Sequence, residues 1–228
     1  IYKKTVTAKC NYYDNDNQKA AVKTINKVMY NNATSVSVKL PKIDNITIDS
    51  VTYTPRGWSK LQNSDGTTIP DSAKGEVSVT LSNDATYYAS YMKSIDVEIY
   101  YCSGNGTPNT TSGNTVSSTS VSGDRYINYR GDVKESSITI PLVVEESKGY
   151  CGTKYSGVSK EKNSTTDATL NTSSTTYYAY YKKDVTLYYY DGSKHTSSVV
   201  TRNVTIATDE KTYTSKEGSP IPTPSAYN

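Results

Sequence analysis

The chain has 228 residues, of which 23 are tyrosine and none is phenylalanine. Its 25 basic and 22 acidic side chains leave a formal net charge of +3, which provides no basic footprint for nucleic acid. No apolar run approaches the ~18 residues of a membrane-spanning helix, so the sequence also argues against a membrane span.

Strand-favouring residues dominate the composition. Tyrosine is accompanied by 32 Thr and 30 Ser, by many Val and Ile, and by few Leu. β-branched and aromatic side chains favour strands, and a tyrosine ring buries well while its hydroxyl remains hydrated. Because the net charge is small, we expect a folded chain despite the low aliphatic content. The composition therefore predicts a mainly β fold.

The sequence also repeats itself at an interval of about 90 residues. An ordered series of matches rarely arises by chance, so we predict β modules in tandem. Four pairs of segments match in the same order along the chain: Leu40–Pro41 with Ile140–Pro141, Gly57–Lys60 with Gly157–Lys160, Asp84–Lys93 with Ser174–Lys183, and Asp96–Tyr101 with Asp184–Tyr189.

These matches divide the chain into four parts. Residues 1–4 are interpreted as the tail of a preceding repeat, residues 5–93 as repeat 1, residues 94–183 as repeat 2, and residues 184–228 as a partial repeat 3. The chain begins at Ile1 with neither an initiating Met nor a signal peptide, so we expect a processed or excised piece.

Repeat 1 contains one segment with an ambiguous pattern. The aligned residues 199–206 of repeat 3 are rich in β-branched side chains and typical of a strand, which predicts a strand in repeat 1 as well. The competing interpretation is an amphipathic helix, because four apolar residues fall at helical spacing: Val22, Ile25, Val28 and Met29.

One segment of repeat 2 has a biased composition, and the first segment of repeat 3 has a regular alternation of side chains. Residues 104–123 are rich in Ser, Thr, Asn and Gly, which predicts a long mobile loop. Side chains alternate with a period of two over Val185–Tyr190, which indicates a strand.

The pattern of repeat 3 stops partway, because Ile221–Pro222 matches Ile140–Pro141 only shortly before the last residue. Half a repeat would have unpaired strand edges. Two explanations stay open. Either a longer native chain was cut, or the N-terminal strand from Ile1 of a neighbouring copy completes the repeat by strand addition.

Two segments of repeat 1 carry a resemblance to a known family. Tyr53–Lys60 reads Tyr-Thr-Pro-Arg-Gly-Trp-Ser-Lys, and Thr86–Tyr91 reads Thr-Tyr-Tyr-Ala-Ser-Tyr. With the Leu40–Pro41 linker they resemble the Listeria–Bacteroides repeat, also called the internalin-type B repeat. That resemblance implies β-grasp-like modules on bacterial surface proteins, acting as stalks or adhesive spacers. Val158 replaces the family's Trp in repeat 2, so its core must be packed differently.

Adjacent tyrosines on a strand face opposite sides of a sheet. We expect the outward set to include Tyr88, Tyr178 and Tyr180. Cross-strand pairing within a repeat is the favoured role for these side chains. A surface that binds glycans or host protein is the alternative.

The three cysteines indicate the compartment. Cys102 and Cys151 both lie in repeat 2, so a Cys102–Cys151 disulfide is the preferred pairing, and it would stabilise a small module by roughly 3–5 kcal/mol. Cys10 would then be free or would pair between chains. Three buried thiols in a reducing compartment are the alternative.

Residues that carry chemistry are scarce. His195 is the only histidine, and it lies in a predicted hairpin turn, where a solvated role is favoured over catalysis. Asp14–Asn17 alternates like a calcium loop but lacks its Gly and distal Glu, so a polar turn is favoured. We therefore predict no catalytic residue, no metal site and no cofactor.

These observations predict mainly β, small β-grasp-like or β-sandwich-like repeat modules in tandem. We expect a non-enzymatic extracellular structural protein at a bacterial cell surface: a stalk, an adhesin or a filament segment. Its expected partners are other copies of itself or neighbouring repeats, and in addition a surface glycan or protein. The alternative is a carbohydrate- or host-protein-binding module that uses Tyr88, Tyr178 and Tyr180.

Overall fold

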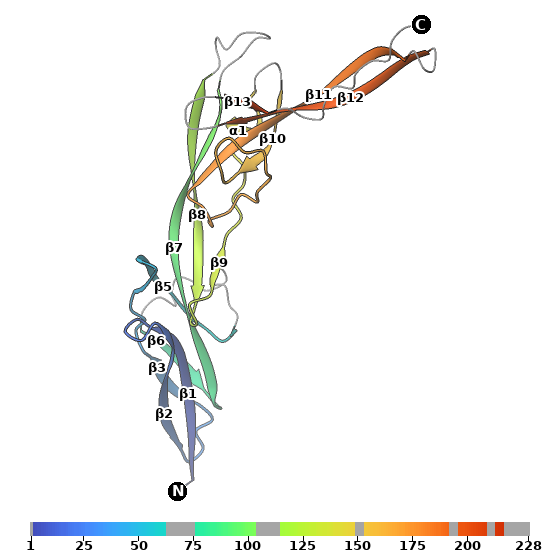
Figure 1. Ribbon diagram of the computed structural model, residues 1–228. Helices are drawn as coiled ribbons and strands as arrows, with labels where there is room; N and C mark the ends of the chain where they lie inside the picture. Colours follow the sequence, from blue (N-terminus) through green and yellow to red (C-terminus); the bar gives the residue numbers. More distant parts are fainter. Residues whose placement is uncertain are drawn as a thin grey trace. The chain divides into compact units, whose positions relative to one another are not determined.

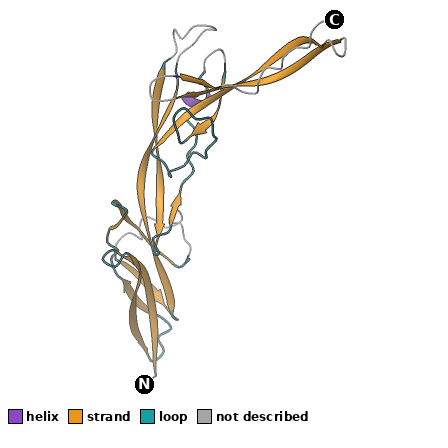
Figure 2. Ribbon diagram, viewed as in Figure 1, coloured by secondary structure: helices purple, strands orange, loops and turns teal. Residues whose placement is uncertain are grey.

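The computed structural model describes residues 2–62, 76–103, 115–148, 153–191, 196–208 and 213–216. These residues form thirteen strands and one short helix, which confirms the prediction of a mainly β fold (Figure 1 and Figure 2). In chain order the elements are β1 (Lys3–Asp14), β2 (Lys19–Tyr30), β3 (Val36–Leu40), β4 (Ile46–Ile48), β5 (Val51–Ser59), β6 (Val77–Leu81), β7 (Ala85–Cys102), β8 (Val116–Asn128), β9 (Val133–Glu135), α1 (Leu142–Glu145), β10 (Lys154–Ser159), β11 (Thr176–Asp191), β12 (Thr196–Thr208) and β13 (Tyr213–Lys216).

The chain forms two compact units, and the division between them falls inside strands. Unit 1 comprises Ile1–Ile95 and Asp124–Ser136, and unit 2 comprises Asp96–Gly123 and Ser137–Asn228. β7 and β8 therefore contribute residues to both units. No helix in the described part of the chain is long and apolar enough to cross a membrane.

Unit 1 is organised around β1 and the first half of β7. β1 pairs with β2 in an antiparallel hairpin along its whole length, and its other edge pairs in parallel with β7. β5 is antiparallel to β7 and forms a hairpin with β4. β3 and β6 form a separate two-stranded sheet. Alternate residues of β1 and β7 supply much of the buried core: Val6, Ala8, Cys10, Tyr87, Ala89 and Tyr91.

The ambiguous segment of repeat 1 is strand β2, as predicted. Every residue of β2 lies opposite a residue of β1, from Lys19 opposite Asp14 to Tyr30 opposite Lys3. Only Met29 of this strand is buried, while Val22 is 57% exposed. The helical spacing of the apolar residues therefore does not correspond to a buried stripe, and pairing with β1 decides the conformation.

Unit 2 is organised around the second half of β7 and the first half of β11. These two strands are parallel, and β10 is antiparallel to β11. The rest of β11 forms a long antiparallel hairpin with β12, which in turn pairs with β13. The strand predicted over Val185–Tyr190 is thus confirmed as part of β11.

The prediction of a loop over residues 104–123 is wrong for its second half. Residues 104–114 lie outside the described residues, but residues 116–123 belong to β8, which pairs with β7. Ser118, Ser120 and Ser122 are exposed, while the residues between them are half-buried. The small polar residues therefore occupy the solvent face of β8. Pairing with β7 makes this segment a strand.

The buried cores of the two units differ in composition. Trp58 of β5 is 8% exposed in unit 1, whereas Val158 of β10 is the residue at the matched position of unit 2. In unit 2 the chain after Pro141 forms α1, and Val144 of this helix is fully buried. This is consistent with the expectation that the core of repeat 2 is packed differently.

Candidate functional site

In both units, a parallel strand pair joins segments that lie far apart in the sequence. In unit 1, Ala8–Asn11 of β1 lies beside Ala85–Tyr88 of β7. In unit 2, Glu98–Tyr100 of β7 lies beside Thr176–Tyr178 of β11. The strand that opens each predicted repeat is thus hydrogen-bonded to the strand that closes it. We call these two contacts the parallel pairs.

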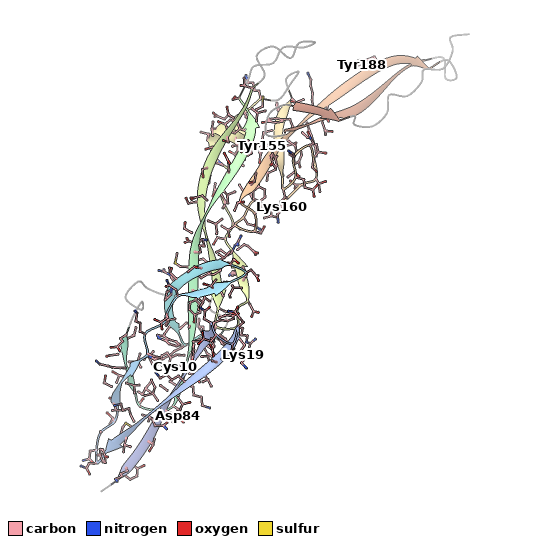
Figure 3. The ribbon with its side chains drawn as sticks, turned by 60° about the vertical axis from the view of Figure 1, so that its left-hand side comes forward. Cys10, Lys19, Asp84, Tyr155, Lys160 and Tyr188 are labelled. Carbon is pink, nitrogen blue, oxygen red and sulfur yellow. The ribbon has the colours of Figure 1, made fainter. Side chains whose placement is uncertain are left out.

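Each parallel pair is extended by one further hydrogen bond. In unit 1, the Thr7 amide donates to the Asp84 carboxylate over 2.8 Å (Asp84 is labelled in Figure 3). In unit 2, the Glu98 amide donates to the Thr175 carbonyl over 2.9 Å. In each unit, therefore, an amide of the opening strand donates a hydrogen bond. The acceptor is a side-chain oxygen in unit 1 and a main-chain oxygen in unit 2.

A buried tyrosine hydroxyl links the same two strands in each unit. In unit 1, the Tyr13 amide donates to the Tyr91 hydroxyl over 3.1 Å. In unit 2, the Cys102 amide donates to the Tyr181 hydroxyl over 2.6 Å, and Ser147 Oγ lies 2.9 Å from that hydroxyl. Tyr91 is 1% exposed and Tyr181 is fully buried. Each hydroxyl therefore satisfies a backbone donor at the end of an opening strand.

Burial raises the pKa of the Tyr91 phenol to about 12, although the hydrogen bond from the Tyr13 amide acts in the opposite direction. Desolvation dominates because the phenolate would lose its hydration in this core. The hydroxyl therefore stays protonated over the physiological range. It can accept the amide hydrogen bond while it remains neutral.

These hydroxyl contacts were not predicted from the sequence. Tyr91 and Tyr181 occupy the same position of the matched segments Asp84–Lys93 and Ser174–Lys183. That coincidence was the available signal. The amides that they meet belong to the far end of another strand, and no local pattern indicates them.

The tyrosines predicted to face outward are not exposed. Tyr178 is 7% and Tyr180 is 2% exposed, and Tyr88 is half-buried. The cause is that β11 is covered on both faces from Tyr177 to Tyr181, so neighbouring residues pointing to opposite sides are all buried. The expected exposure of Tyr178 and Tyr180 is therefore corrected.

Each of these three side chains has a partner within its own unit. The Tyr178 ring stacks on Tyr100, with centroids 5.4 Å apart and planes at 15°. The Tyr180 hydroxyl donates to the Asp167 carboxylate over 3.1 Å. The Tyr88 ring lies 5.1 Å from the Tyr129 ring. Of these contacts, the Tyr178–Tyr100 stack joins two paired strands of one predicted repeat, whereas Asp167 and Tyr129 lie outside strands.

The cysteines do not all lie in the described part of the chain. Cys10, labelled in Figure 3, is a fully buried thiol on β1, and desolvation raises its pKa. Cys102 is buried at the end of β7. Cys151 lies outside the described residues, so the Cys102–Cys151 disulfide stays a prediction.

The Asp14–Asn17 segment forms a tight polar turn between β1 and β2. The Asp14 carboxylate accepts hydrogen bonds from the amides of Asp16 and Asn17 and from the Asn17 side chain. These bonds, led by the side-chain bond, lower the pKa of Asp14. The carboxylate is thus used inside the turn, as expected of a side chain that caps its own loop.

Other chemical groups contribute little to a site. Among the residues that the structure describes, no three His, Cys, Asp or Glu side chains converge where they could hold a metal ion. His195 and its turn lie outside the described residues.

A pocket of about 270 Å³ opens in unit 1 beside the end of β1. Its lining includes the buried Trp58, Tyr91 and Ile46 together with the exposed Lys23. The Trp58 indole donates to the Pro41 carbonyl over 2.9 Å, which fixes the ring. The volume is just below the roughly 300–1,000 Å³ of small-molecule sites.

Comparisons with known proteins found no match for this chain among family models, curated proteins or solved structures. The resemblance to the Listeria–Bacteroides repeat therefore stays a prediction. Two features that the units share are the parallel pairs and the buried tyrosine hydroxyls that meet an opening strand.

Proposed function

We propose that this chain is a non-enzymatic structural segment of an extracellular surface protein, built of tandem β repeats that carry mechanical load. A stalk, an adhesin or a filament segment are forms of this one role. The observation that carries the proposal is the parallel pairing of the opening and closing strands in both units.

Parallel pairing of these strands gives a specific mechanical response. Tension enters a repeat through its opening strand and leaves through its closing strand. When the two strands are parallel and hydrogen-bonded, this tension acts along the strands, and the evenly spaced hydrogen bonds are loaded together. An antiparallel hairpin pulled at its open end breaks one bond at a time. The parallel pairs should therefore resist force well.

The continuity of β7 supports the same role. Its residues 85–88 close one parallel pair, and its residues 98–100 open the next, within a single strand of 18 residues. Tension would thus pass from one predicted repeat to the next through a hydrogen-bonded strand. A chain that carries load benefits from this arrangement, because a flexible linker would extend first.

The tandem-repeat part of the proposal is supported by strand register. β5 on β7 and β10 on β11 both shift register immediately before a glycine, between Pro55 and Gly57 and between Tyr155 and Gly157. After each shift, the residue pairs that β5 makes with β7 are equivalent, in the sequence match, to those that β10 makes with β11. Trp58 lies opposite Ala89 in unit 1, and Val158 lies opposite Ala179 in unit 2.

The carbohydrate-binding alternative has lost its main support, because Tyr178 and Tyr180 are buried. An extracellular location is proposed from the resemblance and from the preferred disulfide. It is tested by whether an antibody against this chain labels intact cells of the source organism.

The load-bearing role is tested by single-molecule force spectroscopy in two pulling directions. Handles at Tyr2 and Lys183 load both parallel pairs along their strands. Handles at Tyr2 and Tyr30 pull apart the β1–β2 hairpin from its open end, where Lys3 lies opposite Tyr30. We expect a clearly higher unfolding force in the first direction. Equal or lower force there would contradict the proposal.

A further inference from the structure

The second half of β11 has an edge without a partner strand in the described structure. β12 pairs with one edge of β11 from Tyr180 to Asp191, and β10 pairs with the opposite edge from Tyr178 to Lys182. Among the described residues, no strand continues along that opposite edge from Asp184 to Asp191. We call this the acceptor edge. Unpaired amides and carbonyls on such an edge can pair with another strand.

β7 shows what an edge of this kind binds. β7 pairs with β5 opposite residues 88–92 and, farther along, in parallel with β11 at Glu98–Tyr100. Under the sequence match of Asp96–Tyr101 with Asp184–Tyr189, those positions correspond to Thr186–Tyr188 of the acceptor edge. The acceptor edge is therefore the counterpart of an edge that already holds a parallel strand.

A tyrosine ring provides a second, independent observation. Tyr188 lies on the ribbon formed by β11 and β12 (Figure 3), and it is 82% exposed. Its counterpart Tyr100 stacks on Tyr178, the second tyrosine of the Thr-Tyr-Tyr segment that pairs with β7. A large exposed ring at a position where the matched ring is stacked indicates a contact surface for a partner.

We infer that the acceptor edge is a docking site for an extended segment of a partner polypeptide that carries a Thr-Tyr-Tyr sequence. This segment lies parallel to β11, with its second tyrosine opposite and stacked on Tyr188. Its residue before the Thr accepts the Thr186 amide, as Thr175 accepts the Glu98 amide. Main-chain hydrogen bonds supply affinity, and the stacked tyrosine supplies specificity.

This inference goes beyond the load-bearing role. It relies on the same sequence match between repeats, but it concerns one edge and one ring rather than mechanical resistance. Its test is a binding measurement, so it can fail while the force experiment succeeds, and the reverse also holds.

The test uses the full chain and a labelled peptide with the sequence of residues 174–183, Ser-Thr-Thr-Tyr-Tyr-Ala-Tyr-Tyr-Lys-Lys. Fluorescence anisotropy measures binding, and amide hydrogen exchange locates it. We expect saturable binding of one peptide per chain and slower exchange of the Thr186 and Tyr188 amides. A scrambled peptide should not bind.

Variants separate the stacked ring from the rest of the surface. Tyr188→Ala should weaken peptide binding roughly 2- to 10-fold, the range expected for one aromatic pair. Alanine in place of the second tyrosine of the peptide should have the same effect, and the two changes together should cost little more than either alone. The matched control is Tyr30→Ala on β2, where the tyrosine is also exposed and binding should not change.

Three results would overturn the inference. The first is unchanged exchange of Thr186 and Tyr188 at saturating peptide. The second is faster exchange across residues 177–181, which would mean that the peptide replaces β11 rather than docking beside it. The third is binding of the scrambled peptide as tightly as the Thr-Tyr-Tyr peptide, which would mean that the edge does not recognise this sequence.

Discussion

Tyrosine hydroxyls act as main-chain hydrogen-bond partners inside this protein. Tyr91 and Tyr181 each accept an amide hydrogen bond from an opening strand. The Tyr177 hydroxyl meets the backbone of residues 169–171, accepting from the Asn171 amide and lying 3.2 Å from the Thr169 carbonyl. Phenylalanine would fill the same volume but would leave these groups unsatisfied. At these positions, therefore, the abundance of tyrosine has a structural cause.

Replacing Tyr91 with Phe should destabilise unit 1 by about 1–3 kcal/mol. The variant keeps the ring but leaves the Tyr13 amide buried without its acceptor, and that desolvation is not recovered. Urea unfolding monitored by circular dichroism measures the change. The control is Tyr30→Phe, where the tyrosine is 52% exposed, and we expect a change within about 0.5 kcal/mol. A Tyr91→Phe protein as stable as the parent would show that the amide finds another acceptor.

Strand pairing in both units depends on a glycine next to a bulge. Gly57 has a φ of 139°, which side chains other than glycine rarely adopt. Gly157 is limited by space, because a Cβ there would lie 2.7 Å from both the Tyr180 hydroxyl and the Asp167 carboxylate. The same residue type thus serves two different needs at matched positions of β5 and β10.

Gly157→Ala should therefore destabilise the pairing of β10 with β11 by about 1–3 kcal/mol, since an added methyl group forces the buried Tyr180 ring to move. The free energy of unfolding and the exchange rates of the β10 amides measure this loss. Ser156→Ala provides the matched control, because Ser156 is exposed on the same strand. Loss of stability of equal size in both variants would contradict the steric explanation.

Taken as a whole, the chain should be sensitive to alkaline pH, because phenols with a raised pKa occur in both units. Burial raises the pKa of Tyr91 and of Tyr155 to about 12, from an ordinary value near 10. The unfolded chain loses these protons from pH 10, while the folded chain keeps them until about pH 12. Stability is therefore complete below pH 10 and falls as the pH rises toward 12.

Urea midpoints measured between pH 8 and pH 12 test this expectation. The half-buried Tyr155 contributes less than Tyr91, because water screens its phenolate. The Tyr91→Phe variant should lose stability less steeply across this window than the parent protein. Identical slopes for the two proteins would show that Tyr91 ionises alike in the folded and unfolded states.

Local sequence patterns were sufficient for several structural features. β-branched residues and tyrosines predicted the mainly β fold, and period-two alternation predicted the strand over Val185–Tyr190. Comparison of the repeats predicted that β2 is a strand despite its helical spacing. These predictions succeeded because strand propensity and side-chain period are properties of neighbouring residues.

Tertiary contacts decided the remaining features. Residues 116–123 are rich in serine and were predicted as loop, but pairing with β7 makes them a strand. Tyr178 and Tyr180 were predicted to face solvent, but segments on both faces of β11 bury them. The parallel pairs and the hydroxyl contacts of Tyr91 and Tyr181 join residues almost 80 positions apart. Composition and periodicity show which residues form strands, whereas long-range packing determines which strands meet and which faces become dry.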